Sequence, residues 1–268
     1  MSLLRIRDLV VEARSESKIV QAVNHVDFEI GESEVVGLIG ESGSGKTTLV
    51  RSILDLLERN VRITNGSIEY SGNTVVDVAR GHSDLSQVRG SQIGMVFQSP
   101  RSSLDPLMTI GGHLREVLRR HKSGISREEI RKRSIEVLGE MGLEAERVMR
   151  SYPHQLSGGM CQRAAIAIAI ASFPSLLIAD ECTSALDVTS QEEVVDVLKH
   201  LTQDRKMALI FVTHDMLLAS ELCDRLVVMQ NGVVVESGTT AQILGDPREE
   251  YTKQLIAAVP RWTPAGTA

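Results

Sequence analysis

A glycine-rich stretch, GESGSGKT at residues 40–47, separates two segments of very different character. The run VVGLIG before it is continuously apolar, which is typical of a strand buried on both faces. After it, Leu49, Ile53, Leu54 and Leu57 follow helical spacing. A strand, a glycine turn and a helix in this order predict an α/β protein in which N–H groups of the turn face an anion.

The same stretch fits GxxxxGK[ST], the pattern of a phosphate-binding loop. In that pattern the lysine, here Lys46, reaches the β- and γ-phosphates of a nucleotide, and the Thr47 hydroxyl binds Mg²⁺. A flexible glycine–serine turn would have a similar composition, but the flanking strand and helix favour the loop. We expect the nucleotide to be bound by Gly40, Ser42, Gly43, Ser44, Gly45, Lys46, Thr47 and Thr48.

A second apolar run, residues 176–179, ends in two carboxylates. Asp180 is placed to hold Mg²⁺, and Glu181 is placed to accept a proton from an attacking water. The alternative is a buried strand that simply emerges into solvent, which the phosphate-binding loop disfavours. This pair predicts hydrolysis rather than binding alone.

Residues 156–160, LSGGM, stand before a helical stretch at residues 161–171. Ser157, Gly158 and Gly159 would form a second anion site, because a helix N-terminus offers free N–H donors. Together with the two preceding motifs, this signature resembles the ATP-binding cassette (ABC) ATPases. In that family two cassettes pair head to tail around ATP, and the resemblance implies the same pairing here.

Other positions match the family in the expected order. The resemblance implies that Gln98 contacts Mg²⁺ and the attacking water and senses a membrane partner. It implies that residues 184–187, SALD, form the D-loop, and that His214 contacts the γ-phosphate. The implied cofactors are ATP and Mg²⁺. The implied catalytic residues are Glu181, His214 and Gln98, and the implied Mg²⁺ ligands are Thr47, Gln98 and Asp180.

Three segments, residues 97–110, 152–157 and 185–189, look like the peptide/nickel importer subfamily. The resemblance implies a subunit that hydrolyses ATP to power import of a peptide or nickel chelate, at the cytoplasmic face of the inner (plasma) membrane. Its implied partners are a second cassette, more often a sibling than a copy, two integral membrane permease subunits and, through them, an extracytoplasmic solute-binding protein.

The chain also departs from the family pattern. Cys182 stands where the family has proline, and no aromatic residue occupies residues 13–20, where many cassettes stack adenine, so selectivity for ATP over GTP is left open. Met160 and Cys161 replace the usual end of the signature.

Composition limits the possible partners and functions of the chain. Lys and Arg number 29 against 35 Asp and Glu, a net charge of −6, and only 3% of residues are aromatic, so no nucleic-acid partner is expected. The alternative function is a soluble ABC-type ATPase acting as a nucleotide-dependent clamp or regulator. A GTPase or phosphotransferase would leave the LSGG element unexplained.

The predicted fold is a P-loop NTPase core with a parallel sheet, an antiparallel β subdomain and an inserted α-helical subdomain. We expect a single ABC ATPase domain over residues 1–268. Within it we expect a nucleotide-binding core at 1–97 and 173–240, a helical signature subdomain at 98–172, and short helices with a frayed tail at 241–268. Capping boxes at Ser126/Glu129 and Ser190/Glu193 predict two helix starts, and Asn231-Gly232 predicts a hairpin. The polar segment around residues 71–90 is predicted to be a loop.

Overall fold

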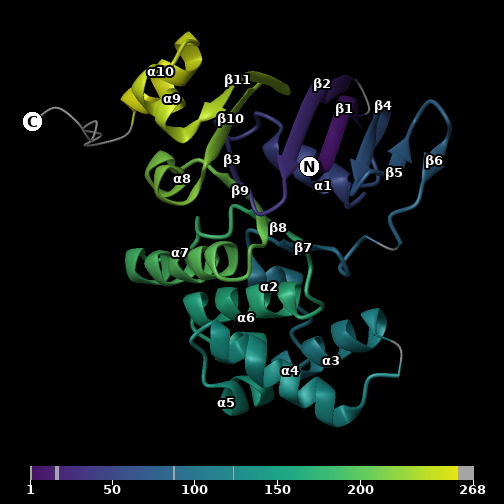
Figure 1. Ribbon diagram of the computed structural model, residues 1–268, viewed down its shortest axis with the longest axis vertical. Coiled ribbons are helices and arrows are strands. Elements are labelled where there is room, and N and C mark those ends of the chain that lie inside the picture. Colours follow the sequence, from purple (N-terminus) through teal and green to yellow (C-terminus); the bar gives the residue numbers. More distant parts are fainter. Residues whose placement is uncertain (1, 16–17, 87, 123, 259–268) are drawn as a thin grey trace, which may run out of the picture. The chain divides into compact units, whose positions relative to one another are not determined.

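The computed structural model describes residues 2–15, 18–86, 88–122 and 124–258 (Figure 1). The chain divides into two compact units. The first joins Met1–Ser86 to Ile210–Ala268, and the second is Gln87–Leu209. Each unit combines helices with strands, which confirms the predicted α/β class. The tail expected at residues 260–268 lies outside the described residues.

The first unit contains an antiparallel sheet in the order β2-β1-β4-β5-β6. Ile6 in the central strand lies opposite Phe28 on one side and Ile68 on the other, and all three side chains are buried. Its strands are β1 (Ser2–Arg14), β2 (Ile19–Gly31), β4 (Val61–Tyr70), β5 (Asn73–Asp77) and β6 (His82–Ser83).

The same unit holds the strand that leads into the glycine-rich loop. All five residues of β3 (Val35–Ile39) are buried, and β10 (Arg225–Gln230) runs parallel beside it. The hairpin to β11 (Val233–Thr239) turns at Asn231 and Gly232, whose φ angles of 50° and 82° are those of a type I′ turn, as predicted. The helices of this unit are α1 (Lys46–Ile53), α8 (Met216–Leu222), α9 (Thr240–Gly245) and α10 (Glu250–Ala257).

In the second unit β7 (Ile93–Val96) and β8 (Leu176–Asp180) pair in parallel. Helices α3, α4, α5 and α6 pack against one another, coloured teal in Figure 1. The chain then passes into the first unit within β9 (Ala208–Thr213). The helices are α2 (Pro100–Ser103), α3 (Ile110–His121), α4 (Arg127–Glu140), α5 (Ala145–Arg150), the 3₁₀ helix η1 (Pro153–Gln155), α6 (Gly158–Ile170) and α7 (Val188–Gln203).

The capping box predicted at Ser126 is confirmed. Glu129 N–H donates to the Ser126 hydroxyl at 3.1 Å, and the Glu129 carboxylate accepts from Ser126 N–H at 2.9 Å. The hydrogen bonds from Ser126 lower the pKa of Glu129 to about 2, because they favour its charged form.

Two local predictions are wrong. Helix α7 begins at Val188 and its N-cap is Asp187, whose carboxylate accepts from Ser190 N–H at 3.0 Å, so Ser190 lies inside the helix. A carboxylate one turn earlier outcompeted the serine, because it accepts a charge-assisted hydrogen bond. The segment 71–90, predicted as a loop, contains β5 and β6, because β4 offers an edge for β5 to pair with.

Within the described residues, no helix combines the length and apolar character needed to cross a lipid bilayer.

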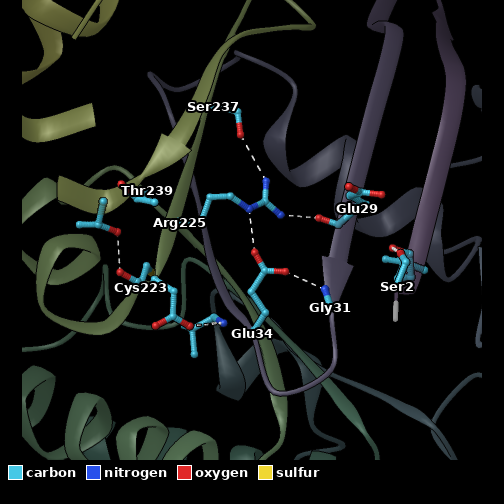
Figure 2. A network of polar contacts seen from close by, with 12 residues as sticks. Ser2, Glu29, Gly31, Glu34, Cys223, Arg225, Ser237 and Thr239 are labelled. Atoms are coloured by element: carbon cyan, nitrogen blue, oxygen red, sulfur yellow. Dashed lines mark hydrogen bonds and ion pairs between the residues drawn. The ribbon is translucent and has the colours of Figure 1, made fainter. Parts of the chain in front are cut away.

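A polar network joins the two sheets of the first unit (Figure 2). The Arg225 guanidinium donates to Glu34 Oε1 at 2.7 Å, to the Glu29 carbonyl at 2.6 Å and to Ser237 Oγ at 3.2 Å. The other Glu34 oxygen accepts from Gly31 N–H at 2.6 Å. Because the Arg225 and Glu34 side chains are only 24% and 26% exposed, the ion pair is weakly screened and fixes the turn between β2 and β3 to β10.

We expect Arg225→Ala to lower the free energy of unfolding by about 1–3 kcal/mol, because it leaves the Glu34 carboxylate half-buried without its cation. Lys253→Ala is the control, since its pair with Glu250 is 50% and 76% exposed and should change stability by less than about 0.5 kcal/mol. Urea unfolding measures both. Equal losses in the two variants would contradict a structural role for the network.

Candidate functional site

Glycine occurs at positions 40, 43 and 45 of the loop for different structural reasons. A Cβ on Gly40 would lie 2.2 Å from the Met229 carbonyl oxygen, and one on Gly45 would lie 2.4 Å from that of Ala22. Gly43 also has a positive φ, 83°, but nothing lies within 4 Å of its Cβ position. The fold itself therefore requires Gly40 and Gly45, whereas Gly43 lines open space that a ligand can approach.

Lys46 is the cation of this loop and is only 3% exposed. Its ammonium donates to the carbonyls of Gly40 at 2.7 Å and Glu41 at 2.8 Å, and to Ser44 Oγ at 3.3 Å. These contacts turn the carbonyls toward Lys46. The loop thus holds a positive charge at the N-terminus of α1, where an anion is favoured.

The loop is anchored by segments from the far end of the chain. Gly232 N–H, in the β10–β11 turn, donates to the Ser44 carbonyl at 2.9 Å, and Asn24 N–H donates to the Gly232 carbonyl at 2.8 Å. Glu41 N–H donates to the hydroxyl of Tyr251 on α10 at 3.0 Å. Tyr251 could not be identified from the sequence, because no spacing pattern links a residue 210 positions away to the loop.

Helix α10 is in turn held by β11. The Glu236 carboxylate accepts from Arg248 N–H at 2.8 Å and from Glu249 N–H at 3.2 Å, at the N-terminus of α10. These hydrogen bonds outweigh partial burial and lower the pKa of Glu236. The hydrogen bonds of Glu236 therefore hold the helix that carries Tyr251, and the Tyr251 hydroxyl in turn holds the loop at Glu41.

In the second unit the structure brings Gln98 and Glu181 together. Gln98 follows β7 and Glu181 follows β8, and because these strands are parallel neighbours their carboxyl ends meet at one edge. Gln98 Nε2 donates to Glu181 Oε2 at 2.9 Å and lies 3.4 Å from Ser184 Oγ, which itself donates to the Glu181 carbonyl at 3.0 Å. The amide therefore orients the carboxylate predicted as the general base.

Glu181 has a φ of 47°, a left-handed conformation that costs a non-glycine residue about 1–2 kcal/mol. Such strain is typical of functional positions held by their surroundings. Asp180 before it is 1% exposed. Cys182 after it is also 1% exposed, and burial raises the pKa of its thiol to about 12, so it stays neutral and is no nucleophile.

The signature residues lie at the start of α6. Ser157 is the N-cap and its Oγ accepts from Met160 N–H at 3.2 Å. Arg101 donates to the Leu156 carbonyl at 2.8 Å and so fixes the approach to this helix. Gly158 is exposed, whereas a Cβ on Gly159 would lie 2.7 Å from Ser190 Oγ. Gly159 is therefore required by packing against α7, and Gly158 is the glycine open to a ligand.

His214 is exposed in the first unit, between β9 and α8. The following Asp215 is the N-cap of α8, and its carboxylate accepts from Leu217 N–H at 2.8 Å and from Leu218 N–H at 3.2 Å. The residues predicted to bind nucleotide thus fall in both units. Residues 40–48 and His214 lie in the first, and Gln98, Ser157, Gly158, Gly159, Asp180 and Glu181 lie in the second.

Residues 23–184 match the model of the ABC transporter family. The oligopeptide transport ATP-binding protein AmiE of Streptococcus pneumoniae serotype 4 is 41% identical over 260 residues, which cover 97% of this chain and 73% of AmiE. This chain belongs to the ABC transporter family. A putative peptide import ATP-binding protein of Brucella melitensis biotype 1 is 43% identical over 97% of this chain and 78% of its own length.

Solved ABC structures share the fold. The ATP-binding cassette MJ0796, in a dimeric post-hydrolysis state bound to ADP and Pi, is 32% identical with a TM-score of 0.77 over 88% of this chain and 98% of that one. CbiO1 from Clostridium perfringens, part of the ABC transporter complex cbiONQ, is 26% identical with a TM-score of 0.75 and covers 91% of each chain. The predictions of an ABC ATPase fold and of ATP as the nucleotide are confirmed.

The two classes of glycine in the ABC phosphate-binding loop should respond differently to alanine. We expect Gly45→Ala to lower the free energy of unfolding by about 3–5 kcal/mol, because the new Cβ meets the Ala22 carbonyl and φ is 103°. Gly43→Ala, the matched control, should cost about 1–2 kcal/mol from its backbone conformation alone while weakening ATP binding. Thermal unfolding and calorimetric titration measure the two effects, and equal destabilisation would contradict this division.

The contact of Tyr251 with the loop can be tested by removing one oxygen atom, the hydroxyl that accepts from Glu41 N–H. We expect Tyr251→Phe to weaken ATP binding about threefold to tenfold, the value of one net hydrogen bond, because the loop amide at Glu41 loses its fixed acceptor. The melting temperature should change by less than about 2 °C, since the ring is kept.

Tyr152→Phe, which removes a hydroxyl in the other unit, is the control and should leave ATP affinity unchanged. Hydrogen exchange at the Glu41 amide should accelerate in Tyr251→Phe alone. Unchanged exchange there would show that the hydroxyl does not hold the loop.

Proposed function

We propose that this chain is the ATP-hydrolysing subunit of a binding-protein-dependent ABC importer whose cargo is a peptide. The observation that carries this proposal is its similarity to peptide-transport ATP-binding proteins over 97% of its length. The hydrogen bond from Gln98 to Glu181 supports hydrolysis, because it orients a carboxylate for proton transfer.

In the proposed mechanism the N–H groups of the loop and the Lys46 ammonium bind the phosphates of ATP. The nucleotide-binding residues are Gly40, Ser42, Gly43, Ser44, Gly45, Lys46, Thr47 and Thr48, with Ser157, Gly158 and Gly159 presented to the ATP of a partner cassette. Glu181 accepts the proton of the attacking water, Gln98 orients Glu181, and His214 donates a hydrogen bond to the γ-phosphate.

The residues proposed as Mg²⁺ ligands suit that ion, because a hydroxyl, an amide and a carboxylate supply the oxygen atoms that Mg²⁺ prefers. They are Thr47, Gln98 and Asp180. Bound Mg²⁺ would neutralise charge on the phosphates.

We propose that the chain pairs with a second cassette, because Ser157 and Gly158 present an exposed helix N-terminus that can bind the phosphates of that cassette's ATP. We propose a sibling cassette as this partner, two permease subunits as the membrane channel, and a solute-binding protein that delivers the peptide to them. We propose accordingly that the chain acts as a peripheral subunit at the cytoplasmic face of the inner (plasma) membrane.

We also propose that residues 1–97 and 173–240 act as the nucleotide-binding core of one ABC ATPase domain. Residues 98–172 would act as its signature subdomain, followed by the C-terminal segment 241–268.

Glu181→Gln tests the mechanism, because it keeps the side chain's shape and a hydrogen bond but removes the base. We expect ATP hydrolysis to fall by about 10²–10⁴-fold while ATP binding is kept. With Mg-ATP and the sibling cassette, this variant should form a long-lived dimer in light scattering. Adding Ser157→Arg should abolish the dimer by blocking the helix N-terminus.

Glu192→Gln is the matched control, since Glu192 is exposed on α7 and should keep full hydrolysis. Cells lacking the gene should lose uptake of labelled peptide and recover it with the wild type and Glu192→Gln but not with Glu181→Gln. Normal peptide uptake in the deletion strain would refute the cargo, and a monomeric Glu181→Gln protein with ATP and each candidate sibling would refute the pairing.

A further inference from the structure

The helical part of the second unit contains a recess lined by four arginines. Its volume is about 450 Å³, and Arg115 and Arg119 of α3 face it together with Arg127 and Arg131 of α4. Gly111, Ile130, Ser134 and Met149 complete its lining. In the part of the chain that the structure describes, no acidic side chain lines the recess.

Among the described residues, three of the four arginines have no anionic partner. Arg131 pairs with Glu146 of α5, whereas no hydrogen bond or ion pair of the Arg115, Arg119 or Arg127 side chains occurs within the described ranges. The surrounding segment, residues 110–150, has ten Lys and Arg against seven Glu and so carries +3, whereas the rest of the chain carries −9. The positive charge is therefore concentrated in an otherwise acidic protein.

The recess brings like charges side by side, although Arg119, in the last turn of α3, also interacts favourably with the C-terminal end of that helix. Arg115 and Arg119 stand one turn apart on α3, and Arg127 and Arg131 stand one turn apart on α4, so each pair places like charges side by side. Arg127 also lies at the N-terminus of α4, where the helix dipole disfavours a cation. A recess that is lined by these like charges and by no acidic side chain is suited to bind an anion from solution.

We propose that this recess binds a phosphate-bearing anion. A guanidinium presents two parallel N–H donors that match two phosphate oxygens, and two helices here supply such forks toward one cavity. The recess has the volume of a small-ligand site, and the apolar side chains of Ile130 and Met149 on its wall lower the local polarity and strengthen the ion pairs.

A phosphate fits better than an acidic protein segment. The centres of protein interfaces combine Arg with exposed aromatic and other large apolar side chains. The exposed large apolar residues among the described residues are Ile19, Val20, Leu107, Tyr152, Phe173, Val188 and Leu217, and none of them lines the recess. The phosphate can belong to a free compound or to a lipid headgroup, since the recess recognises only the group that they share.

Calorimetric titration of the full chain with inorganic pyrophosphate tests the proposal. All proteins carry Lys46→Ala and are kept without Mg²⁺, so that the phosphate-binding loop contributes little to the signal. We expect Arg115→Gln with Arg119→Gln to weaken pyrophosphate binding about tenfold or more, because two forks are lost. The melting temperature should change by less than about 2 °C, because removal of the like-charge pair offsets the loss of a cation from the last turn of α3.

Arg147→Gln with Arg150→Gln is the matched control, because it removes the same charge from α5 outside the recess and should change the affinity less than about twofold. Arg115→Lys with Arg119→Lys keeps the charge but loses the forks and should give an intermediate affinity. Absence of pyrophosphate binding, or an equal loss in the control, would overturn the proposal. Binding of an oligoglutamate peptide in place of pyrophosphate would also overturn it, in favour of an acidic protein partner.

Vesicle flotation separates the two sources of phosphate. Binding to phosphatidylglycerol vesicles but not to phosphatidylcholine vesicles, lost in the Arg115→Gln/Arg119→Gln protein, would assign the recess to an anionic lipid headgroup. Pyrophosphate binding without vesicle binding would assign it to a free phosphate compound. Either result supports the phosphate chemistry of the recess.

Discussion

The hydrogen bonds of the buried Lys46 ammonium are the constraint around which the phosphate-binding loop is arranged. The ammonium is almost completely buried and it draws the carbonyls of Gly40 and Glu41 toward itself. A buried cation is tolerated only with such partners, so the loop backbone must close tightly around it. That closure brings Gly40 against the Met229 carbonyl and Gly45 against the Ala22 carbonyl, where only glycine fits. At these two glycines β10 and β2 lie directly against the loop backbone.

The supports of the loop come from the other end of the chain. Gly232 and Tyr251 each donate to or accept from the loop backbone, and Arg225 ties β10 to the turn before β3. These contacts explain why residues after 210 belong to the same compact unit as the N-terminal segment. The C-terminal strands and helices are therefore part of the phosphate-binding apparatus, because without them the loop would lose its outer hydrogen bonds.

Local chemistry could be predicted from the sequence, and long-range packing could not. The Ser126/Glu129 box and the Asn231-Gly232 turn are determined by neighbouring residues, so their patterns predicted them correctly. The start of α7 was misplaced because both Asp187 and Ser190 are suitable N-cap residues, and the sequence pattern does not rank the two. The packing role of Gly159 and the contact of Tyr251 depend on residues distant in sequence, which a motif does not contain.

The arginines of the second unit separate into two groups by their partners. Arg133 donates to the carbonyls of Ala171 and Ile170 at 3.1 Å each, at the C-terminal end of α6, and its guanidinium lies 3.3 Å from the centre of the Phe173 ring. Arg163 pairs with Glu193 at 3.1 Å, and Arg205 pairs with Glu140. These side chains hold helices together, since each charge is matched by an acceptor within the unit. The side chains of Arg115, Arg119 and Arg127 make no such match in the described part of the chain, so contacts within the unit do not account for their gathering around one recess, whereas binding of an external anion would.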